Sequence, residues 1–170
     1  MNSPFLLENQ TEYKKWRDYK LAQYPISREK ILIKFKNNDI NNNKINLLKD
    51  SVTKYNFAMY EFDAKLTNES LKKFCSRLKL VNSVSNLLAD EDDISNITNQ
   101  NQSKEKSPDV EYIPYTNKQL NWHTDGYYYP LDSAIKSFLL HCEHPAQRGG
   151  ENIILDHEII YIYLRDHNPE

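Results

Sequence analysis

Apolar residues recur at helical and strand spacing through the first ninety residues, and this pattern predicts a scaffold. A charged helix is expected over residues 11–23, and apolar positions between residues 45 and 55 predict a second helix. Two short apolar runs, residues 31–35 and 56–62, have the length of strands. Thr67 is a suitable N-cap for a third helix, whose buried stripe contains Leu71, Phe74, Leu78 and a packed, structural Cys75.

The pattern changes after residue 90. Residues 91–109 are almost entirely polar and predict a long surface loop. Between residues 110 and 155, short apolar runs alternate with turn residues, which is typical of strands, and Asp156 can cap a final helix. A helical layer followed by a run of strands predicts one α+β domain over residues 1–170, with an antiparallel sheet or barrel. The apolar side of the final helix is expected to consist of Ile159, Ile160, Tyr163 and Leu164.

Composition and charge exclude several classes of partner. The chain has 22 Lys and Arg against 24 Asp and Glu, so it lacks the basic surface that nucleic-acid binding needs. No apolar run approaches the roughly 20 residues that span a bilayer, and residues 1–10 do not read as a signal peptide. Two cysteines far apart in sequence provide no disulfide framework. We therefore expect a soluble, cytoplasmic protein that binds neither nucleic acid nor membrane.

Glycine is rare, and its positions indicate where the backbone is constrained. The chain has only Gly126, Gly149 and Gly150, whereas an average usage of about 7% would give roughly a dozen. Glycine is needed where φ is positive or another group approaches closely, so the chemistry is expected from about residue 111 onward. Gly149 and Gly150 are predicted to form a tight connection between two strands, with a positive φ at one of them at least.

His123 and Asp125 form the candidate metal site. On an extended strand, residues i and i+2 point to the same side, about 6.6 Å apart at Cα, so the imidazole and the carboxylate can reach one ion. They would supply two of the three protein ligands of a 2-His-1-carboxylate triad, which leaves open positions on non-haem Fe(II). A His-x-Asp pair also occurs by chance. A zinc or magnesium protein that uses the two residues differently is therefore an alternative.

The surroundings of this pair resemble a known family. Three motifs carry the resemblance: WHTDGY at residues 122–127, LHC at 140–142, and GGEN followed by Asp156. They resemble the TauD/TfdA family of Fe(II)- and 2-oxoglutarate-dependent dioxygenases, of the clavaminate-synthase-like type. The resemblance covers residues 110–170 and, more loosely, 50–90. It implies a double-stranded β-helix, or jelly roll, with its first strands in residues 110–170 and the N-terminal helices packed on the sheet.

The resemblance also implies an activity and its site residues. His123 and Asp125 would be the first two ligands of Fe(II), and Tyr127 and Tyr128 would line the substrate side of the pocket. Asn152 stands where the family commonly has a threonine that contacts the co-substrate 2-oxoglutarate. The implied reaction is the hydroxylation or oxidation of a small organic acid or amine.

Two further groups of the family pattern have no match in this chain. The third iron ligand, a histidine, and the arginine that pairs with 2-oxoglutarate are expected beyond residue 170, so the chain is expected to be the N-terminal part of an oxygenase. The alternative is a catalytically inactive fragment that binds metal or forms a homo-oligomer, because an incomplete barrel leaves strand edges and apolar faces open. Five nearby residues do not fit either missing role: His141, His144, His157, His167 and Arg148.

Overall fold

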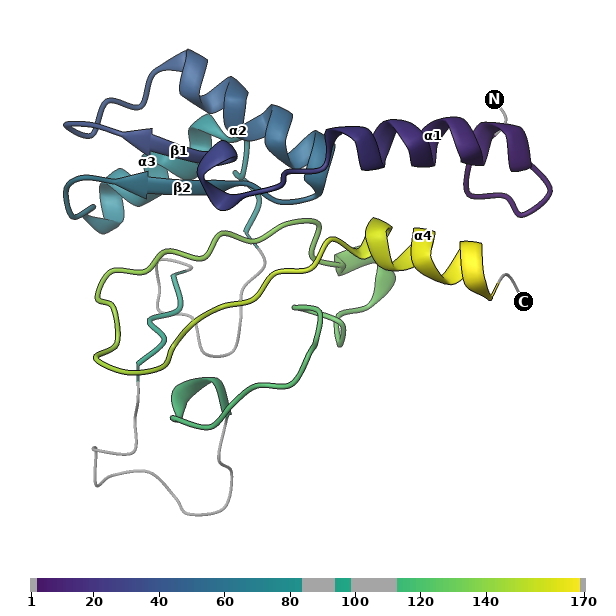
Figure 1. Cartoon of the computed structure of the whole chain (residues 1–170). Coiled ribbons are helices and arrows are strands. Elements are labelled where there is room, and N and C mark those ends of the chain that lie inside the picture. Colours follow the sequence, from purple (N-terminus) through teal and green to yellow (C-terminus); the bar gives the residue numbers. More distant parts are fainter. Residues whose placement is uncertain (1–2, 84–93, 99–112, 169–170) are drawn as a thin grey trace. The chain divides into compact units, whose positions relative to one another are not determined.

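The computed structural model describes residues 3–83, 94–98 and 113–168, and its elements are shown in Figure 1. The chain separates into two compact units, one formed by residues 1–78 with 142–170 and the other by residues 79–141. The first unit contains the helices and strands labelled in Figure 1: α1 (Gln10–Gln23), β1 (Leu32–Phe35), α2 (Asn42–Tyr55), β2 (Met59–Phe62), α3 (Asn68–Arg77) and α4 (His157–His167). No helix in the described part of the chain is long and apolar enough to cross a bilayer.

A β-α-β motif forms the centre of the first unit. β1 and β2 pair in parallel, from Leu32 opposite Met59 to Phe35 opposite Phe62. α2 connects the two strands and returns the chain to the end at which β1 began, so the pair is parallel. The antiparallel sheet is expected of the run of strands after residue 110, and the sequence pattern predicts no direction of pairing for these two strands. The predicted strand positions themselves are confirmed.

An aromatic cluster closes the core beside this motif. The rings of Phe35 and Phe62 stack with their centroids 4.6 Å apart, and Phe74 of α3 meets Phe35 edge-on at 5.4 Å. Phe35 and Phe74 are almost fully buried. Cys75 is half-buried on the same helix, and burial raises the pKa of its thiol, as expected for an unreactive packing residue.

Side-chain caps begin α2, α3 and α4, and those at Thr67 and Asp156 confirm the predicted starts of α3 and α4. The side chain of Asn41 accepts a hydrogen bond from the backbone N–H of Lys44, and that of Thr67 accepts one from Ser70. Asp156 caps α4 in the same way, by accepting from the N–H of Glu158. Each cap satisfies a backbone donor that has no partner within its helix, so the ends of α2, α3 and α4 follow from local sequence.

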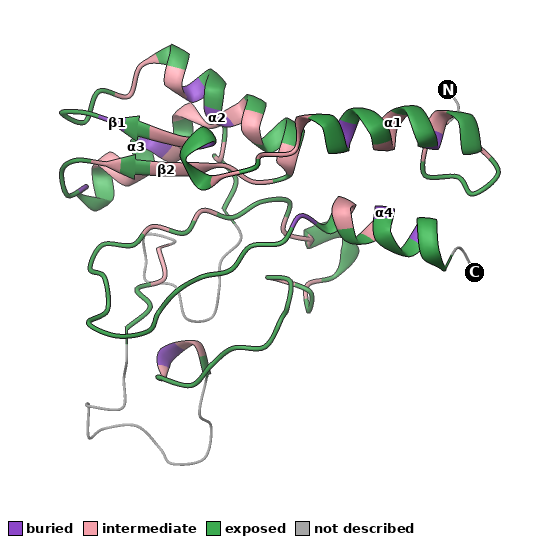
Figure 2. Cartoon of the chain, in the orientation of Figure 1, coloured by how far each residue is buried: buried purple, intermediate pink, exposed green. Residues whose placement is uncertain are grey.

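The inner face of α4 differs from the expected one. Ile162 and Arg165 are buried, while Ile160, Tyr163 and Leu164 are exposed, as Figure 2 shows by colour along α4. The Tyr13 hydroxyl of α1 donates to Asp166, with 2.8 Å between the oxygens, which places α1 beside α4. Burial, together with this hydrogen bond, raises the pKa of Tyr13 to about 12. The apolar periodicity indicated the wrong face because a charged residue takes a core position.

Arg165 occupies that position with both terminal nitrogens of its guanidinium hydrogen-bonded, while its buried Nε has no hydrogen-bond partner among the described residues. It lies over the Tyr13 ring, 3.9 Å from the centroid, and donates to the carbonyl oxygens of Pro4, Leu6 and Leu7. These contacts attach residues 4–7 to α4. The hydrogen bonds of the two terminal nitrogens and the aromatic ring below the guanidinium offset much of the cost of burying its charge.

A buried lysine joins three separate parts of the first unit. Lys20 of α1 is 6% exposed, and its ammonium lies 2.7 Å from Asp156 Oδ2 and 2.7 Å from the carbonyl oxygen of Lys54. Glu158 forms a second ion pair with it, and Asn56, at the end of α2, donates to the other oxygen of Asp156. Burial disfavours the charge of Lys20, but the bonds to Asp156 and Glu158 outweigh it and raise the pKa. The stabilisation is therefore present at neutral pH and is lost only as the pH rises past about 10.4.

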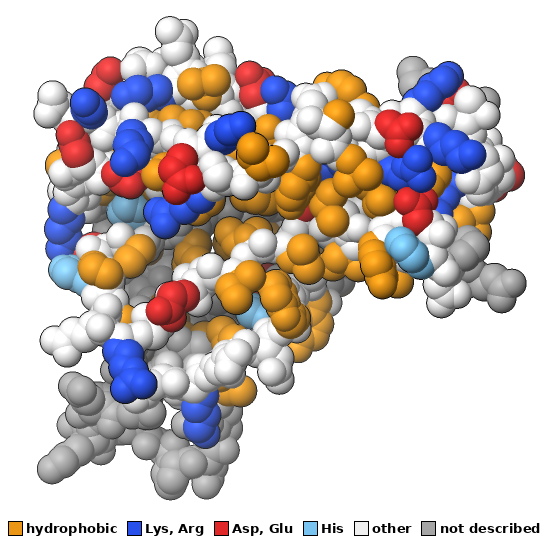
Figure 3. Space-filling view, viewed as in Figure 1, with side chains coloured by type: hydrophobic (Ala, Val, Ile, Leu, Met, Phe, Trp, Pro, Cys, Tyr) orange, Lys and Arg blue, Asp and Glu red, His pale blue; other side chains and the backbone are white. Residues whose placement is uncertain are grey.

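The described residues between 113 and 155 form no strand. The first strands of a jelly roll, expected in residues 110–170, are thus not observed there, and no barrel is confirmed. Apolar side chains of this region remain exposed, among them Phe138, Leu140, Ile153 and Leu155. Figure 3 shows exposed apolar side chains on the face in view. The predicted loop at 91–109 lies largely outside the described residues, and residues 94–98 have no regular structure.

Gly149 and Gly150 both have positive φ, of 74° and 80°, which confirms the backbone prediction made for them. The strands that they were expected to connect are not formed, because residues 136–155 are irregular on both sides. The glycines therefore fix the local path of the backbone without a hairpin around it.

Replacing Asp156 with Ala should destabilise the first unit by about 3 kcal/mol, because the buried ammonium of Lys20 loses its closest carboxylate and α4 loses its cap. Urea unfolding followed by circular dichroism measures this loss. Asp18→Ala is the matched control, since Asp18 pairs with Arg17 at the surface and should cost less than about 1 kcal/mol. Equal losses in the two variants would contradict a special role for the Lys20 network.

Candidate functional site

The candidate metal residues lie in the second unit, on irregular backbone that leads into a turn. Residues 125–128 form this turn, and the N–H of Tyr129 donates to the carbonyl oxygen of Gly126, 3.0 Å away. His123 and Asp125 therefore do not lie on an extended strand, as the sequence had suggested. The turn, and not strand alternation, directs their side chains.

Gly126 makes this turn possible in two ways. Its φ is 71°, which an L side chain adopts only with strain. A Cβ at this position would also lie 2.5 Å from Cδ1 and 2.8 Å from Cγ1 of Ile135. The side chain of Ile135 thus occupies the space beside the turn, and it holds the backbone directly after Asp125 in place.

The side chains of His123 and Asp125 meet. Nε2 of the imidazole lies 3.5 Å from Oδ1 of the carboxylate, and the two side chains are 44% and 48% exposed. The other ring nitrogen, Nδ1, lies 2.7 Å from the carbonyl oxygen of Asn121. A carbonyl oxygen only accepts hydrogen bonds, so Nδ1 carries a proton and donates it.

This hydrogen bond determines what the pair can bind. In a neutral imidazole with its proton on Nδ1, the lone pair is on Nε2, which is the nitrogen that faces Asp125. Two electron-pair donors that face each other repel unless a proton or a metal ion lies between them. A backbone carbonyl that orients a histidine through its second nitrogen is also the usual arrangement around protein metal ions.

The separation of the two donors suits a metal ion. Ligands about 2.1 Å from an ion are about 3.0 Å apart at a right angle and about 3.4 Å apart at a tetrahedral angle. The observed 3.5 Å between Nε2 and Oδ1 requires only a small adjustment to either arrangement. His123 and Asp125 therefore fit two positions of the Fe(II) centre that the family resemblance implies, and their role as ligands stays a prediction.

The other predicted site residues are more loosely placed. Tyr127 and Tyr128 are 78% and 59% exposed, and their rings meet edge-on with centroids 5.5 Å apart. Asn152 is exposed in the first unit, and its side chain donates to the carbonyl oxygen of Gly150 at 3.4 Å. The structure does not test the roles of these three residues toward substrate and 2-oxoglutarate.

Sequence reasoning missed Asn121 and Ile135. Asn121 acts through its backbone, so no residue type could have indicated it, whereas Gly126 did signal that a side chain approaches closely. Over the described ranges, no group of three or more His, Cys, Asp or Glu side chains is close enough to hold a metal ion together. His123 and Asp125 are thus a pair of candidate ligands without a third among the described residues.

Comparison with known proteins identifies the family. The family described as "Taurine catabolism dioxygenase TauD, TfdA family" matches residues 18–170. The chain belongs to this family. A curated relative named uridine-5'-phosphate dioxygenase, from Streptomyces sp, is 38% identical over 56 residues, which are 33% of this chain and 20% of the relative. The match thus spans a fifth of that protein's length. No solved structure matches the chain.

Membership in the TauD/TfdA family makes this chain related to oxygenases. The match covers both the β-α-β motif and the segment of His123 and Asp125. The resemblance found in the motifs of residues 122–156 is thereby confirmed, and it extends further toward the N-terminus than the motifs alone indicated.

Co(II) serves as a spectroscopic substitute for Fe(II). His123→Ala and Asp125→Ala should each weaken Co(II) binding by more than roughly 100-fold, because removal of a group that only supports a ligand already costs roughly 10–100-fold. The visible absorption of bound Co(II) measures the affinity. His144→Ala is the control and should leave it unchanged. If all three variants bind Co(II) like the unaltered chain, the two residues are not its ligands.

Gly126→Ala should weaken the same Co(II) binding, since the added methyl group collides with Ile135 and displaces the turn that carries Asp125. Gly149→Ala is the matched control, because its φ is similarly positive but no atom lies within 4 Å of the added Cβ. Both variants should lose about 1–2 kcal/mol of stability from the left-handed backbone. Only the first should change Co(II) affinity, and an equal change in both would exclude a role for Ile135.

Proposed function

We propose that His123 and Asp125 belong to the Fe(II) centre of a 2-oxoglutarate-dependent dioxygenase that oxidises a small organic acid or amine. The observation that supports this most is the orientation of the pair, in which Nε2 of His123 faces Oδ1 of Asp125 at 3.5 Å while Asn121 holds Nδ1. Family membership supports the reaction class. Together they favour a redox metal centre over a structural zinc or magnesium site.

Each residue of the turn has a separate task in this proposal. A ferrous ion bound here together with 2-oxoglutarate supplies the activation of dioxygen. His123 donates a nitrogen lone pair, and its hydrogen bond to the Asn121 carbonyl orients the ring so that Nε2 faces Asp125. Asp125 donates an anionic oxygen and lowers the net positive charge of the site. Gly126 keeps both ligands at one end of the turn.

The aromatic residues after the turn are proposed to face the substrate. Tyr127 and Tyr128 follow the second ligand directly, and their exposed rings offer both apolar surface and hydroxyl groups. The matched relative is named for uridine-5'-phosphate, whose base could lie against such rings. Uridine-5'-phosphate is therefore the first substrate to test, ahead of simple organic acids and amines.

The number of ligands limits what this chain does by itself. Family chemistry needs three protein ligands and a cation for the distal carboxylate of 2-oxoglutarate, and the described residues bring together two ligands. Iron should therefore be held weakly, and decarboxylation of 2-oxoglutarate should not be coupled to oxidation of a substrate. A catalytically inactive fragment that only binds metal is the competing proposal.

Succinate release separates the two proposals. The chain is loaded anaerobically with Fe(II), 2-oxoglutarate and uridine-5'-phosphate and is then exposed to oxygen. We expect slow succinate formation without a matching amount of oxidised uridine-5'-phosphate, falling to the level of free iron in Asp125→Ala. Identical release from the unaltered chain and from Asp125→Ala would reject the proposed function. Fast, fully coupled turnover would show instead that a further group completes the site.

A further inference from the structure

A groove with a volume of about 360 Å³ lies beside β1 and α2 in the first unit, away from the candidate metal pair in sequence. Five consecutive residues, 30–34, line it, together with Lys44, Leu47 and Ser51 of α2. Three of the five, residues 32–34, belong to β1, whereas Lys30 ends a 3-10 turn at Arg28–Lys30. Successive side chains of a strand point to opposite faces, so three strand residues in a row can line one groove only where it follows the edge of the strand. The groove therefore runs along an edge of β1.

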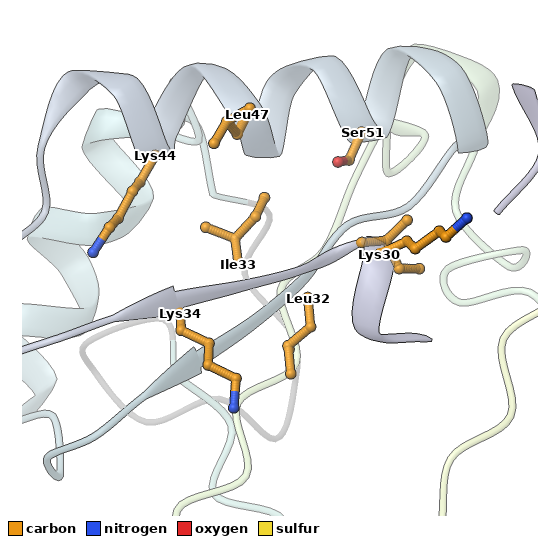
Figure 4. A pocket seen from close by; sticks show the side chains of 8 residues that line it. Lys30, Leu32, Ile33, Lys34, Lys44, Leu47 and Ser51 are labelled. Carbon is orange, nitrogen blue, oxygen red and sulfur yellow. The ribbon is translucent and has the colours of Figure 1, made fainter. Parts of the chain in front are cut away.

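This edge is open to another strand. Among the described residues, β1 pairs with β2 alone, so alternate residues of β1 direct their backbone N–H and C=O groups toward the groove. Unpaired groups of this kind form hydrogen bonds with an added strand. Figure 4 shows that α2 forms the opposite wall, with Leu47 facing Ile33 across the space.

The charges around the groove indicate what kind of strand fits. Lys30 and Lys44 lie at its two ends in Figure 4, and Lys34 is the third lysine. None of the eight described residues that line the groove is acidic. Lys34 has a surface carboxylate partner in Glu61, at 3.2 Å, whereas the Lys44 ammonium lies over the Phe35 ring, 5.3 Å from its centroid.

These lysines disfavour a second copy of the same edge. If two copies of β1 paired in antiparallel fashion, Lys34 of the strand and Lys30 of the preceding turn would bring four lysines from the two copies to one shared edge, and like charges close together across a sheet destabilise it. Lysine on an exposed edge is a common device against self-pairing. A strand that carries carboxylates at those positions would instead form ion pairs with both lysines.

We propose that the open edge of β1 and the Lys44–Leu47–Ser51 face of α2 bind an extended segment of another protein in which acidic and apolar side chains alternate. The backbone of that segment continues the sheet beyond β1. Its apolar side chains contact Ile33 and Leu47, and its carboxylates contact Lys34 of the strand and Lys30 of the turn before it. This docking is independent of the iron centre and of the proposed oxygenase reaction.

The probe is a fluorescein-labelled heptapeptide, Glu-Val-Glu-Val-Glu-Val-Glu, whose fluorescence anisotropy reports binding to the full chain. We expect it to bind, and we expect the backbone amides of residues 32–34 to exchange hydrogen more slowly in the complex. The same peptide with a central proline should bind at least about tenfold more weakly, because proline cannot donate to the sheet. If the two peptides bound equally well, the interaction would be explained by charge alone, and addition of a strand to β1 would be excluded.

Charge reversal tests the role of the lysines. Lys30→Glu combined with Lys34→Glu should weaken binding of the acidic peptide by about tenfold or more and should create binding of Lys-Val-Lys-Val-Lys-Val-Lys. Lys14→Glu combined with Lys15→Glu is the control, because it changes the net charge equally on α1 and should have neither effect. Circular dichroism checks that both variants fold. The proposal would be overturned if the acidic peptide did not bind. It would also be overturned if sedimentation showed that the chain self-associates and that the charge reversal of Lys30 and Lys34 dissociates it.

Discussion

The first unit depends on the neutralisation of one buried charge. Lys20 lies inside, and a buried ammonium requires carboxylates within contact distance. Asp156 meets this requirement and caps α4 at the same time, so the position of α4 is set where the ion pair forms. Tyr13, two turns earlier on the same face of α1, then meets α4 through Asp166. The same contacts explain why two segments distant in sequence make one unit.

The candidate site rests on a different kind of constraint, because all of its parts lie within six residues. The backbone carbonyl of Asn121 accepts a hydrogen bond, His123 and Asp125 supply the two candidate metal-binding atoms, and Gly126 supplies the turn. Such a site needs few long-range contacts, apart from the one with Ile135. The candidate pair can therefore be arranged in a unit that forms no sheet in its described residues. The hydrogen bond to Asn121 also selects the nitrogen of His123 that carries the lone pair, which the sequence motif alone does not specify.

Features with local causes could be predicted from the sequence, and features with distant causes could not. Thr67 and Asp156 cap their helices as predicted, because capping involves residues two or three positions away. The inner face of α4 was misassigned because Arg165 is buried by residues 4–7 and Tyr13, about 150 positions earlier. The direction of pairing between β1 and β2 likewise depends on how α2 crosses between them. His123 and Asp125 were found by type and spacing, although the turn that joins them was taken for a strand.

Among the described residues, residues 136–155 form no strand and the candidate metal pair has no third ligand. Both observations have the same physical cause. A strand satisfies its backbone only beside another strand, so Ile153 and Leu155 stay exposed in irregular chain despite their apolar sequence. β1 and β2 do form, because α2 brings them side by side and the rings of Phe35, Phe62 and Phe74 pack against one another beside them. A third metal ligand likewise needs a distant residue to be held against the turn, and a sheet is what would hold it. Under the proposed function, the strands that would cover Ile153 and Leu155 and the residue that would supply a third ligand both have to come from chain that is distant in sequence from the turn.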